Sequence, residues 1–232
     1  MKLAAFFSGG KDSCYAIYQA MKLGHTIEAL ITIIPCSDES HLLHHQNILL
    51  TKLQSKSMKI PQIIDYSSST ETTDEVLLLK KLIKNAINDF KIEGIVHGGI
   101  MSEFQKLQFE SVCNDLHLNL ISPLWHQNAL KYMKNLLDDD FKIIICSTTT
   151  EGLDDGWLGK EITFDNLKSL DNLSKKFQFN LNFEGGEAET FVINCPIFQK
   201  QVKIVKSEKI WDGYRGRSVS YTHLTLPTKR IV

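Results

Sequence analysis

Ser8-Gly9-Gly10-Lys11-Asp12-Ser13 is the stretch of this chain that decides its fold. It follows an apolar run, residues 3–7, that is long enough for a buried strand, and apolar residues recur after it with the period of a helix. The glycines therefore lie where a strand turns into a helix, and they can adopt backbone angles that other residues avoid. The first amides of a helix have no partner within it and carry the positive end of its dipole, so this loop predicts a site for phosphate oxygens.

The loop differs from two common nucleotide-binding patterns. A Walker loop needs a glycine, four residues and then Gly-Lys-Ser/Thr, whereas Lys11 is followed by Asp12, and a Gly-x-Gly-x-x-Gly fingerprint is absent. The hexapeptide instead resembles the PP-loop of N-type ATP pyrophosphatases, which cleave ATP between the α and β phosphates and activate an acceptor as an adenylate. In that role Lys11 adds a positive charge, Ser13 a hydroxyl and Asp12 a ligand for Mg²⁺.

The composition is that of an ordinary globular protein. The 232 residues suffice for one large domain or two smaller ones, and the formal net charge of −1 gives no global attraction to nucleic acid or membrane, so neither is an expected partner. No apolar run approaches the length of a membrane-spanning helix, and the first residues lack the layout of a signal peptide. The five cysteines are widely spaced without a C-x-x-C pair, which favours reduced thiols and a cytoplasmic location.

Strands and helices alternate over residues 1–146, which predicts an α/β fold with a doubly wound, mostly parallel sheet. Near-continuous apolar runs are typical of parallel strands that are covered on both faces. Strands are expected over residues 28–35, 61–66 and 141–146, and another is expected to end at Gly98-Gly99. Helices are expected over residues 41–57, 73–90, 103–117 and 126–137, with residues 120–125 crossing to the last of them. His41, His44 and His45 are interpreted as a polar helix face rather than a metal site, because no cysteine or carboxylate pattern accompanies them.

Some helix ends carry recognisable signals. Thr73, Ser102 and Asp165 are expected N-caps, because their side chains can accept hydrogen bonds from the first free amides of a helix. The three acids 138–140 end a helix, where negative charge is unfavourable, so we expect them to stay in water.

Two strand ends predict a nucleotide crevice, because ligands of such sheets bind beyond the carboxyl ends of the strands. His97-Gly98-Gly99 ends one strand at the edge where the first loop also lies. His97 itself is either a core histidine or a contact to the ligand. Ile33, at the end of another strand, either faces the nucleotide or belongs only to the core. Both alternatives stay open.

The second part of the chain has a different sequence pattern, which predicts a smaller C-terminal α+β domain. Residues 147–159 are polar with three glycines and one tryptophan, which indicates a linker or a binding segment. A helix is expected over residues 165–177, and a strand over 191–195 has a hairpin partner at 197–205. The segment 211–217 is aromatic and basic, a weak indication of phosphate or RNA contact.

Three carboxylates surround a pair of glycines just before the strand at 191–195. If the chain is already extended at Glu187, the period of two places Glu187 and Glu189 on one face, and Glu184 can join them across Gly185 and Gly186. Gathered carboxylates would suit a cation, an ammonium group or a proton acceptor. The alternative, three surface acids in a glycine turn, is equally open.

Taken together, these motifs resemble the diphthine–ammonia ligase family over about residues 1–217. The matching segments are residues 8–13, His97-Gly98-Gly99 with Ser102-Glu103-Phe104-Gln105, Ser122-Pro123-Leu124-Trp125, Glu151-Gly152-Leu153-Asp154 with Trp157-Leu158-Gly159, Glu184-Gly185-Gly186-Glu187 with Glu189-Thr190, and Cys195-Pro196-Ile197-Phe198. The family amidates diphthine, a modified histidine of translation elongation factor 2. It uses ATP and ammonium, passes through an acyl-adenylate and releases AMP and pyrophosphate.

The resemblance implies roles for particular residues. Lys11, Asp12, Glu187 and Glu189 would be catalytic, and Asp12 would also bind Mg²⁺. The role of Glu187 and Glu189, to bind ammonium or take its proton, is inferred from the placement of their carboxylates rather than from the resemblance. The expected nucleotide-binding residues are Ser8, Gly9, Gly10, Lys11, Asp12, Ser13, Ile33, His97, Gly98 and Gly99. The expected substrate-binding residues are Ser102, Glu103, Gln105, Glu151, Asp154, Trp157, Glu184, Gly185 and Gly186. A homodimer is compatible with this picture. An adenylating enzyme with another acceptor, an RNA or a small molecule, and a non-catalytic ATP-binding sensor are the alternatives.

The resemblance also implies a domain organisation, with a PP-loop domain at residues 1–146 and an acceptor domain at residues 147–217. Three positions or segments depart from the family pattern. Many relatives carry S-D/E-Y-Q-R where this chain has Phe104 and Lys106, and Ala188 replaces a common aromatic residue. These departures put in question the identity of the acceptor substrate, but not the use of ATP. Residues 218–232 have no helical period and contain Pro227, so we expect a non-native or poorly ordered end, with a terminal strand as the alternative.

Overall fold

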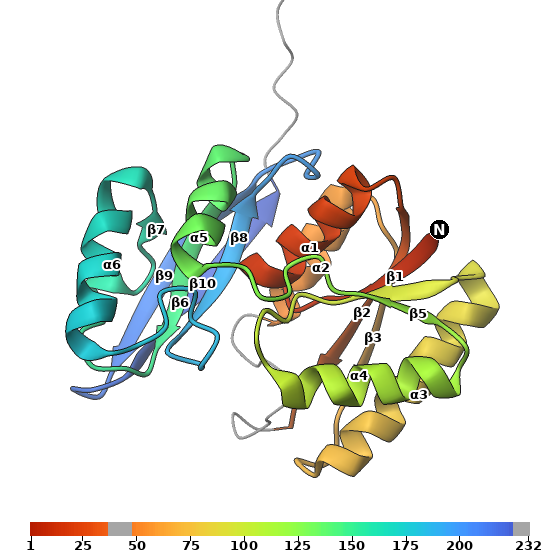
Figure 1. Ribbon diagram of the computed structural model, residues 1–232. Helices are drawn as coiled ribbons and strands as arrows, with labels where there is room; N and C mark the ends of the chain where they lie inside the picture. Colours follow the sequence, from red (N-terminus) through yellow and green to blue (C-terminus); the bar gives the residue numbers. More distant parts are fainter. Residues whose placement is uncertain (37–47, 225–232) are drawn as a thin grey trace, which may run out of the picture.

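The computed structural model describes residues 1–36 and 48–224, and in that part the chain forms two sheets side by side (Figure 1). The three histidines 41, 44 and 45, and the first part of the helix expected over 41–57, lie outside the described residues. Within them, no helix is both long and apolar enough to cross a membrane.

The first sheet is parallel throughout, as the alternating pattern predicted, and its strand order is β3-β2-β1-β4-β5. Its strands are β1 (Lys2–Phe6), β2 (Thr26–Ile34), β3 (Gln62–Tyr66), β4 (Gly94–Val96) and β5 (Asn119–Ile121). Its main helices are α1 (Lys11–Lys22), α3 (Thr72–Phe90) and α4 (Glu103–Asp115). This is the doubly wound α/β arrangement, in which the carboxyl ends of the strands share one edge.

Alternation along β1 explains how this sheet is covered on both faces. Ala4 points to a core shared with α3 and α4, whereas Leu3 and Ala5 point to a core shared with α1. Figure 1 shows α3 and α4 on one side of the sheet and α1 on the other. A strand buried on both faces must be apolar at every position, which is why its sequence showed no polar alternation.

The second sheet is antiparallel, with strand order β7-β6-β10-β9 and β8 paired to β6. Its strands are β6 (Lys142–Thr148), β7 (Glu161–Ile162), β8 (Ala188–Asn194), β9 (Val202–Trp211) and β10 (Gly216–Leu224). The helices α5 (Ala129–Asp138) and α6 (Phe164–Phe177) cover one face. The short helix η1 (Ile48–Leu50) and α2 (Thr51–Met58) lie against the other through Leu50 and Leu53.

Strand β6 departs from the expected domain boundary. Residues 142–146 were expected to belong to the first domain, but they form the strand of the second sheet that pairs with β7, β8 and β10. An uninterrupted apolar run suits any strand that is covered on both faces, and here α5 and α6 cover one face and α2 the other. The sequence pattern of this strand therefore carried no information about which sheet it joins.

The end of the chain also differs from the expectation. Residues 218–224 belong to β10, which pairs with β9 from Gly216↔Trp211 to Leu224↔Val202. Poor order is therefore wrong for residues 218–224, and the terminal strand, the alternative, is present there. Residues 225–232 lie outside the described part.

Of the expected caps, one is confirmed and two are wrong. Ser102 caps α4 by accepting a hydrogen bond from the Gln105 amide. Helix α3 starts one residue before Thr73, and Asp165 lies inside α6, which Thr163 caps instead in a reciprocal pair with Asn166. The local signals thus placed the helices but shifted their first residues by one or two positions.

Asp139 connects the two domains instead of remaining in water. Its carboxylate accepts hydrogen bonds from the hydroxyls of Tyr15, at 2.7 Å, and Tyr18, at 3.1 Å, both on α1. The Tyr15 ring also packs edge-on against Tyr132 of α5 at 5.7 Å between ring centres. These contacts join α1, which begins at the phosphate loop, to the helix that opens the second domain.

Candidate nucleotide and acceptor cleft

A cleft of about 980 Å³ lies where the carboxyl ends of β1, β2 and β4 meet the second sheet. It brings together residues that are far apart in the sequence and come from both domains. The expected site residues that line it are Ser8, Gly10, Lys11, Asp12, Ser13, Ile33, His97, Gly98, Gly99, Ser102, Gln105, Glu184, Gly185, Gly186 and Glu189. The expected crevice is therefore present, and Ile33 belongs to its wall as well as to the core.

The phosphate loop is fixed by contacts from the second domain. Gly9 has a positive φ of 79°, and its carbonyl accepts hydrogen bonds from the Val192 amide at 3.1 Å and from the Gln54 side chain at 2.9 Å. Gln54 donates also to the Val192 carbonyl, at 2.8 Å. The Lys11 amide, at the start of α1, donates to the Thr190 hydroxyl at 3.1 Å. Strand β8 therefore supports the loop along its length.

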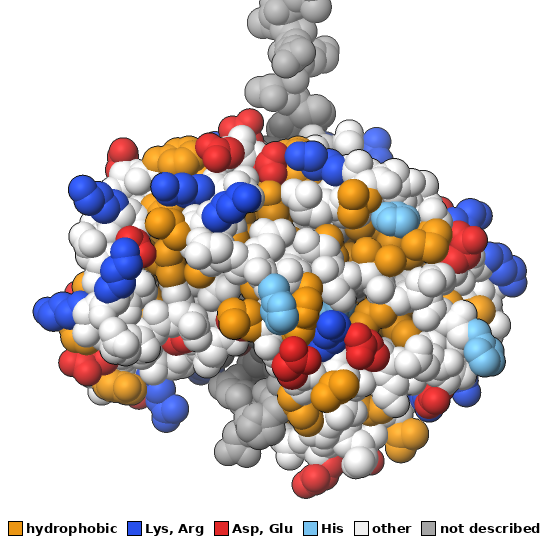
Figure 2. All heavy atoms as spheres, in the orientation of Figure 1, with side chains coloured by type: hydrophobic (Ala, Val, Ile, Leu, Met, Phe, Trp, Pro, Cys, Tyr) orange, Lys and Arg blue, Asp and Glu red, His pale blue; other side chains and the backbone are white. Residues whose placement is uncertain are grey.

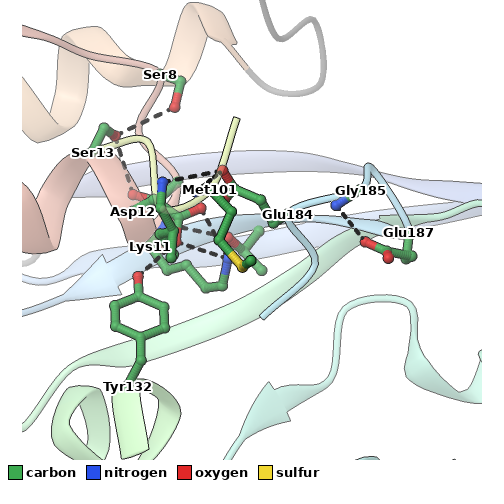
Figure 3. Close-up of polar contacts among 12 residues, drawn as sticks. Ser8, Lys11, Asp12, Ser13, Met101, Tyr132, Glu184, Gly185 and Glu187 are labelled. Atoms are coloured by element: carbon green, nitrogen blue, oxygen red, sulfur yellow. Dashed lines mark hydrogen bonds and ion pairs between the residues drawn. The ribbon is translucent and has the colours of Figure 1, made fainter. Parts of the chain in front are cut away.

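Lys11 and Asp12 form an ion pair at the start of α1 (Figure 3). The Lys11 ammonium lies 2.9 Å from each carboxylate oxygen of Asp12, and the lysine side chain is 2% exposed. The buried Tyr132 hydroxyl donates to Asp12 Oδ1 at 2.6 Å. Burial, and then the nearby Asp12 charge, raise the pKa of Tyr132 well above its ordinary value, so this phenol is a donor at neutral pH.

The loop after β4 packs directly on the phosphate loop. A Cβ on Gly98 would lie 2.6 Å from the carbonyl carbon of Asp12, so only glycine allows this approach. His97 Nε2 lies 2.6 Å from the Ser122 hydroxyl, and Nδ1 accepts a hydrogen bond from the Gly99 amide at 3.1 Å. Burial lowers the pKa of His97 to about 4, so its ring is neutral at physiological pH. His97 is therefore a buried histidine that also forms part of the wall of the cleft.

The three carboxylates near residues 185–186 are not gathered at one point. Glu184 Oε1 accepts hydrogen bonds from the amides of the loop before α4, and Glu187 turns back on its own loop (Figure 3). Glu187 Oε1 accepts from the Asn180 amide and Oε2 from the Gly185 amide, both at 2.9 Å. Glu189 lines the cleft, whereas Glu187 does not. The expected face shared by Glu187 and Glu189 is wrong, because β8 begins only at Ala188.

Four further predicted substrate residues lie outside the cleft. Trp157 is buried in the core, and the Lys160 ammonium lies 4.3 Å from its ring centre. Asp154 caps a short helical turn by accepting from the Gly156 amide at 3.0 Å. Glu151 and Glu103 are exposed and do not line the cleft. The segment 151–159 was expected to bind substrate, but it forms a turn that packs on the core of the second domain.

Several residues in or behind the cleft wall were not predicted as site residues from the sequence. Thr190 and Glu75 line the cleft, and Glu75 of α3 is a buried carboxylate. Tyr132 is buried behind the wall, where its hydroxyl donates to Asp12. Arg215, in the turn between β9 and β10, and Arg217, near the start of β10, also line the cleft. The aromatic and basic segment 211–217 was a signal for the arginines, whereas nothing local marked Tyr132.

The described side chains offer few ligands for a magnesium ion at the cleft. Across residues 1–36 and 48–224, no group of three or more His, Cys, Asp or Glu side chains could hold a metal ion. Mg²⁺ is commonly bound by one or two carboxylates together with substrate phosphates and water. Asp12, whose side chain is 32% exposed beside the phosphate loop, can supply one such carboxylate.

The comparisons with known proteins agree with this geometry. Residues 1–120 match the family model of the diphthamide synthase N-terminal domain, and residues 128–223 that of the diphthamide synthase C-terminal domain. The human diphthine–ammonia ligase is 34% identical over 229 residues, covering 90% of this chain and 85% of that protein. The zebrafish (Danio rerio) diphthine–ammonia ligase is 30% identical over 227 residues, covering 90% and 89%.

Longer and more distant relatives match as well. The Schizosaccharomyces pombe diphthine–ammonia ligase is 29% identical over 228 residues, which are 90% of this chain but 37% of that protein. The match to the N-terminal family model ends at residue 120, in β5, and the match to the C-terminal model begins at residue 128, just before α5. The chain therefore belongs to the diphthamide synthase family, whose matched relatives carry the name diphthine–ammonia ligase.

Proposed function

We propose that this chain is an ATP-dependent ligase that forms a C–N bond, converting diphthine and ammonium into diphthamide with release of AMP and pyrophosphate. The observation that carries the proposal is the shared cleft: the phosphate loop and the second-domain segment 184–190 line one cavity. An enzyme that first activates a carboxylate with ATP and then transfers it to ammonia needs both reactions in one enclosed place.

The phosphate loop is the proposed site of the ATP phosphates. Ser8, Gly10, Lys11, Asp12 and Ser13 all line the cleft at the start of α1, and Lys11 adds positive charge near the phosphates. The acceptor carboxylate attacks the α-phosphate, the α–β bond breaks, and pyrophosphate leaves with the electron pair. Asp12 is the proposed ligand of Mg²⁺, which when bound would neutralise phosphate charge. Lys11 would then exchange Asp12 for phosphate oxygens.

Glu189 is the proposed carboxylate for the ammonium step. It lines the cleft on the β8 side, next to Thr190, whose hydroxyl contacts the phosphate loop. Glu189 would bind ammonium and take the proton that must leave before nitrogen can attack the acyl-adenylate carbonyl. Displacement of AMP then completes the amide. Glu187 has no part in this proposal, because both its carboxylate oxygens accept hydrogen bonds from the backbone of its own loop.

The acceptor is proposed from the names of the relatives and from the sequence motifs. A diphthine residue on translation elongation factor 2 would place the reaction in the cytoplasm and require a protein to dock at the cleft mouth. Phe104 and Lys106, which depart from the common family pattern, lie on α4 beside the cleft residue Gln105. A homodimer is a possible assembly that the proposed chemistry does not need.

The test is a product assay with purified protein, Mg-ATP, ammonium and elongation factor 2 that carries diphthine. We expect AMP, pyrophosphate and an amidated factor in equal amounts, and mass spectrometry of the factor reports the amide. ADP and phosphate would overturn the pyrophosphatase assignment. Tight ATP binding without turnover would support the sensor alternative, and AMP formed with another carboxylate would reassign the acceptor.

A matched pair of variants belongs to the same assay. Asp12→Asn removes the charge beside the phosphate loop and should abolish AMP formation. Asp138→Asn changes an exposed acid at the end of α5, outside the cleft, and should leave the rate unchanged. Equal rates in both variants would remove Asp12 from the mechanism.

A further inference from the structure

We infer that Glu184 is a positioning residue that joins the two domains across the cleft, rather than a ligand for ammonium. The inference rests on the proposed function for the identity of the substrates.

One oxygen of Glu184 receives three consecutive backbone amides. Oε1 lies 3.1 Å from the Ile100 nitrogen, 3.0 Å from the Met101 nitrogen and 3.3 Å from the Ser102 nitrogen. Successive amides that converge on one point form an anion-binding concavity, and hydrogen bonds to an ionised acceptor are stronger than neutral ones. Ser102 is also the N-cap of α4, where the helix dipole favours negative charge.

The contact crosses between domains. Ile100, Met101 and Ser102 follow β4 of the parallel sheet, whereas Glu184 follows α6 and precedes β8 of the antiparallel sheet. The partners are separated by 82 to 84 residues in the sequence. No local preference of either segment can produce this contact, so it forms only when both domains are folded and docked.

The loop that Glu184 contacts also packs on the phosphate loop. Residues 100–102 follow one residue after Gly98, whose Cα approaches Asp12 so closely that a Cβ would lie 2.6 Å from the Asp12 carbonyl carbon. Holding residues 100–102 therefore holds Gly98 against the start of α1. Glu184 fixes the wall that the ATP phosphates meet, and it does so from the domain that carries Glu189.

The same contact makes Oε1 of Glu184 a poor ligand for ammonium. Three amide donors converge on this oxygen, so an ammonium ion at that point would have to compete with them. Glu189 lies on β8 and lines the cleft, and it is the better candidate for binding ammonium. Glu184 and Glu189 are then a positioning carboxylate and a reacting carboxylate five residues apart.

The experiment compares Glu184→Ala, Glu184→Gln and the matched control Glu110→Ala. Glu110 is an exposed carboxylate on α4 that pairs with Lys106 and does not line the cleft. We expect Glu184→Ala to raise the Kd and the KM for ATP by about tenfold, as for loss of a charged hydrogen-bond acceptor, with the KM for ammonium changed less than about twofold. Glu184→Gln keeps an oxygen acceptor and should recover most of the ATP affinity, and Glu110→Ala should match wild type.

Two outcomes overturn the inference. A tenfold rise in the KM for ammonium with an unchanged Kd for ATP would make Glu184 an ammonium ligand. Unchanged amide hydrogen exchange at residues 100–102 in Glu184→Ala would show that Glu184 does not order that loop. The exchange measurement needs no nucleotide and no acceptor, so it remains decisive even if the proposed ligase activity fails. If Glu184→Ala does not fold, the same two measurements on Glu184→Gln, which loses the charge alone, give a smaller effect in the same direction.

Discussion

The two glycine-rich segments that meet at the cleft, residues 8–13 and 184–190, use their polar groups in opposite ways. In the first, the side chains of Ser8, Asp12 and Ser13 line the cavity, and the main chain is supported by β8. In the second, the carboxylates of Glu184 and Glu187 accept hydrogen bonds from backbone amides. Acidic residues beside glycines are therefore not evidence of a ligand site until the free amides around them have been accounted for.

The largest change in the rate of AMP formation should come from a substitution in the first segment, residues 8–13. Lys11→Met keeps the length of the buried side chain but removes its charge, and we expect AMP formation to fall by about 100- to 1,000-fold, as when one preorganised donor to developing charge is lost. The measurement is AMP release under saturating ATP. Lys22→Met, at the exposed end of the same helix, is the control. A rate within threefold of wild type would show that phosphate charge is neutralised elsewhere.

Acid should lower the stability of the fold at His97, which lies in the cleft wall between the two segments. The pKa of His97 is lowered from 6.5 to about 4, so the neutral ring stabilises the fold fully above pH 6.5, and this stability is lost as pH falls through 4. The shift corresponds to about 3 kcal/mol in the free energy of unfolding. Urea denaturation at a series of pH values measures it. The pH dependence should shrink in His97→Gln and persist in His126→Gln, which changes an exposed histidine; equal slopes in the two variants would contradict the assignment.

Tyr132→Phe removes the donor to Asp12 without leaving a cavity. We expect the free energy of unfolding to fall by about 2 kcal/mol, because the lost hydrogen bond is buried and its acceptor is charged. Thermal unfolding measures the change, and Tyr66→Phe, at a largely exposed tyrosine, should be neutral. If Asp12 needs this bond for its orientation, the Mg²⁺ concentration for half-maximal activity should also rise. An unchanged midpoint and an unchanged metal requirement would remove Tyr132 from the site.

The smallest effect should come from the second segment. Glu187→Ala removes two hydrogen bonds within an exposed loop, which should cost about 1 kcal/mol of stability. The rate per folded molecule should stay near wild type, whereas Glu189→Gln should lose most activity. A Glu187→Ala variant that is stable but inactive would reverse the roles of the two glutamates and restore the interpretation drawn from sequence spacing.

The first domain was predictable because local rules decide it. A buried strand, two glycines and a helical period are adjacent in the sequence, so residues 8–13 could be placed at a strand end without knowing the rest of the fold. The same reasoning found His97-Gly98-Gly99, because parallel strands end at one edge. Ser102 was found as a cap since its partner, Gln105, is three residues away.

The second domain was less predictable because its contacts are not local. Tyr132 contacts Asp12 across 120 residues, and no periodicity marks such a pair. The apolar run of β6 fits either sheet, so it was expected in the wrong domain. Trp157 lies in a segment that resembles a family motif and was expected to bind substrate, although its side chain is in the core. Shared motifs and apolar runs alone cannot separate packing from chemistry.

The hydrogen bonds to Gly9 have a consequence for how the enzyme is made. All of the phosphate-loop motif lies within the first 13 residues, yet the Gly9 carbonyl is bonded by Gln54 and by the amide of Val192. During synthesis the loop therefore lacks its hydrogen bonds to Thr190 and Val192 until those residues have left the ribosome and β8 has formed. The nascent first domain would be a poor consumer of ATP, and nucleotide binding would begin only when the reaction can also be completed.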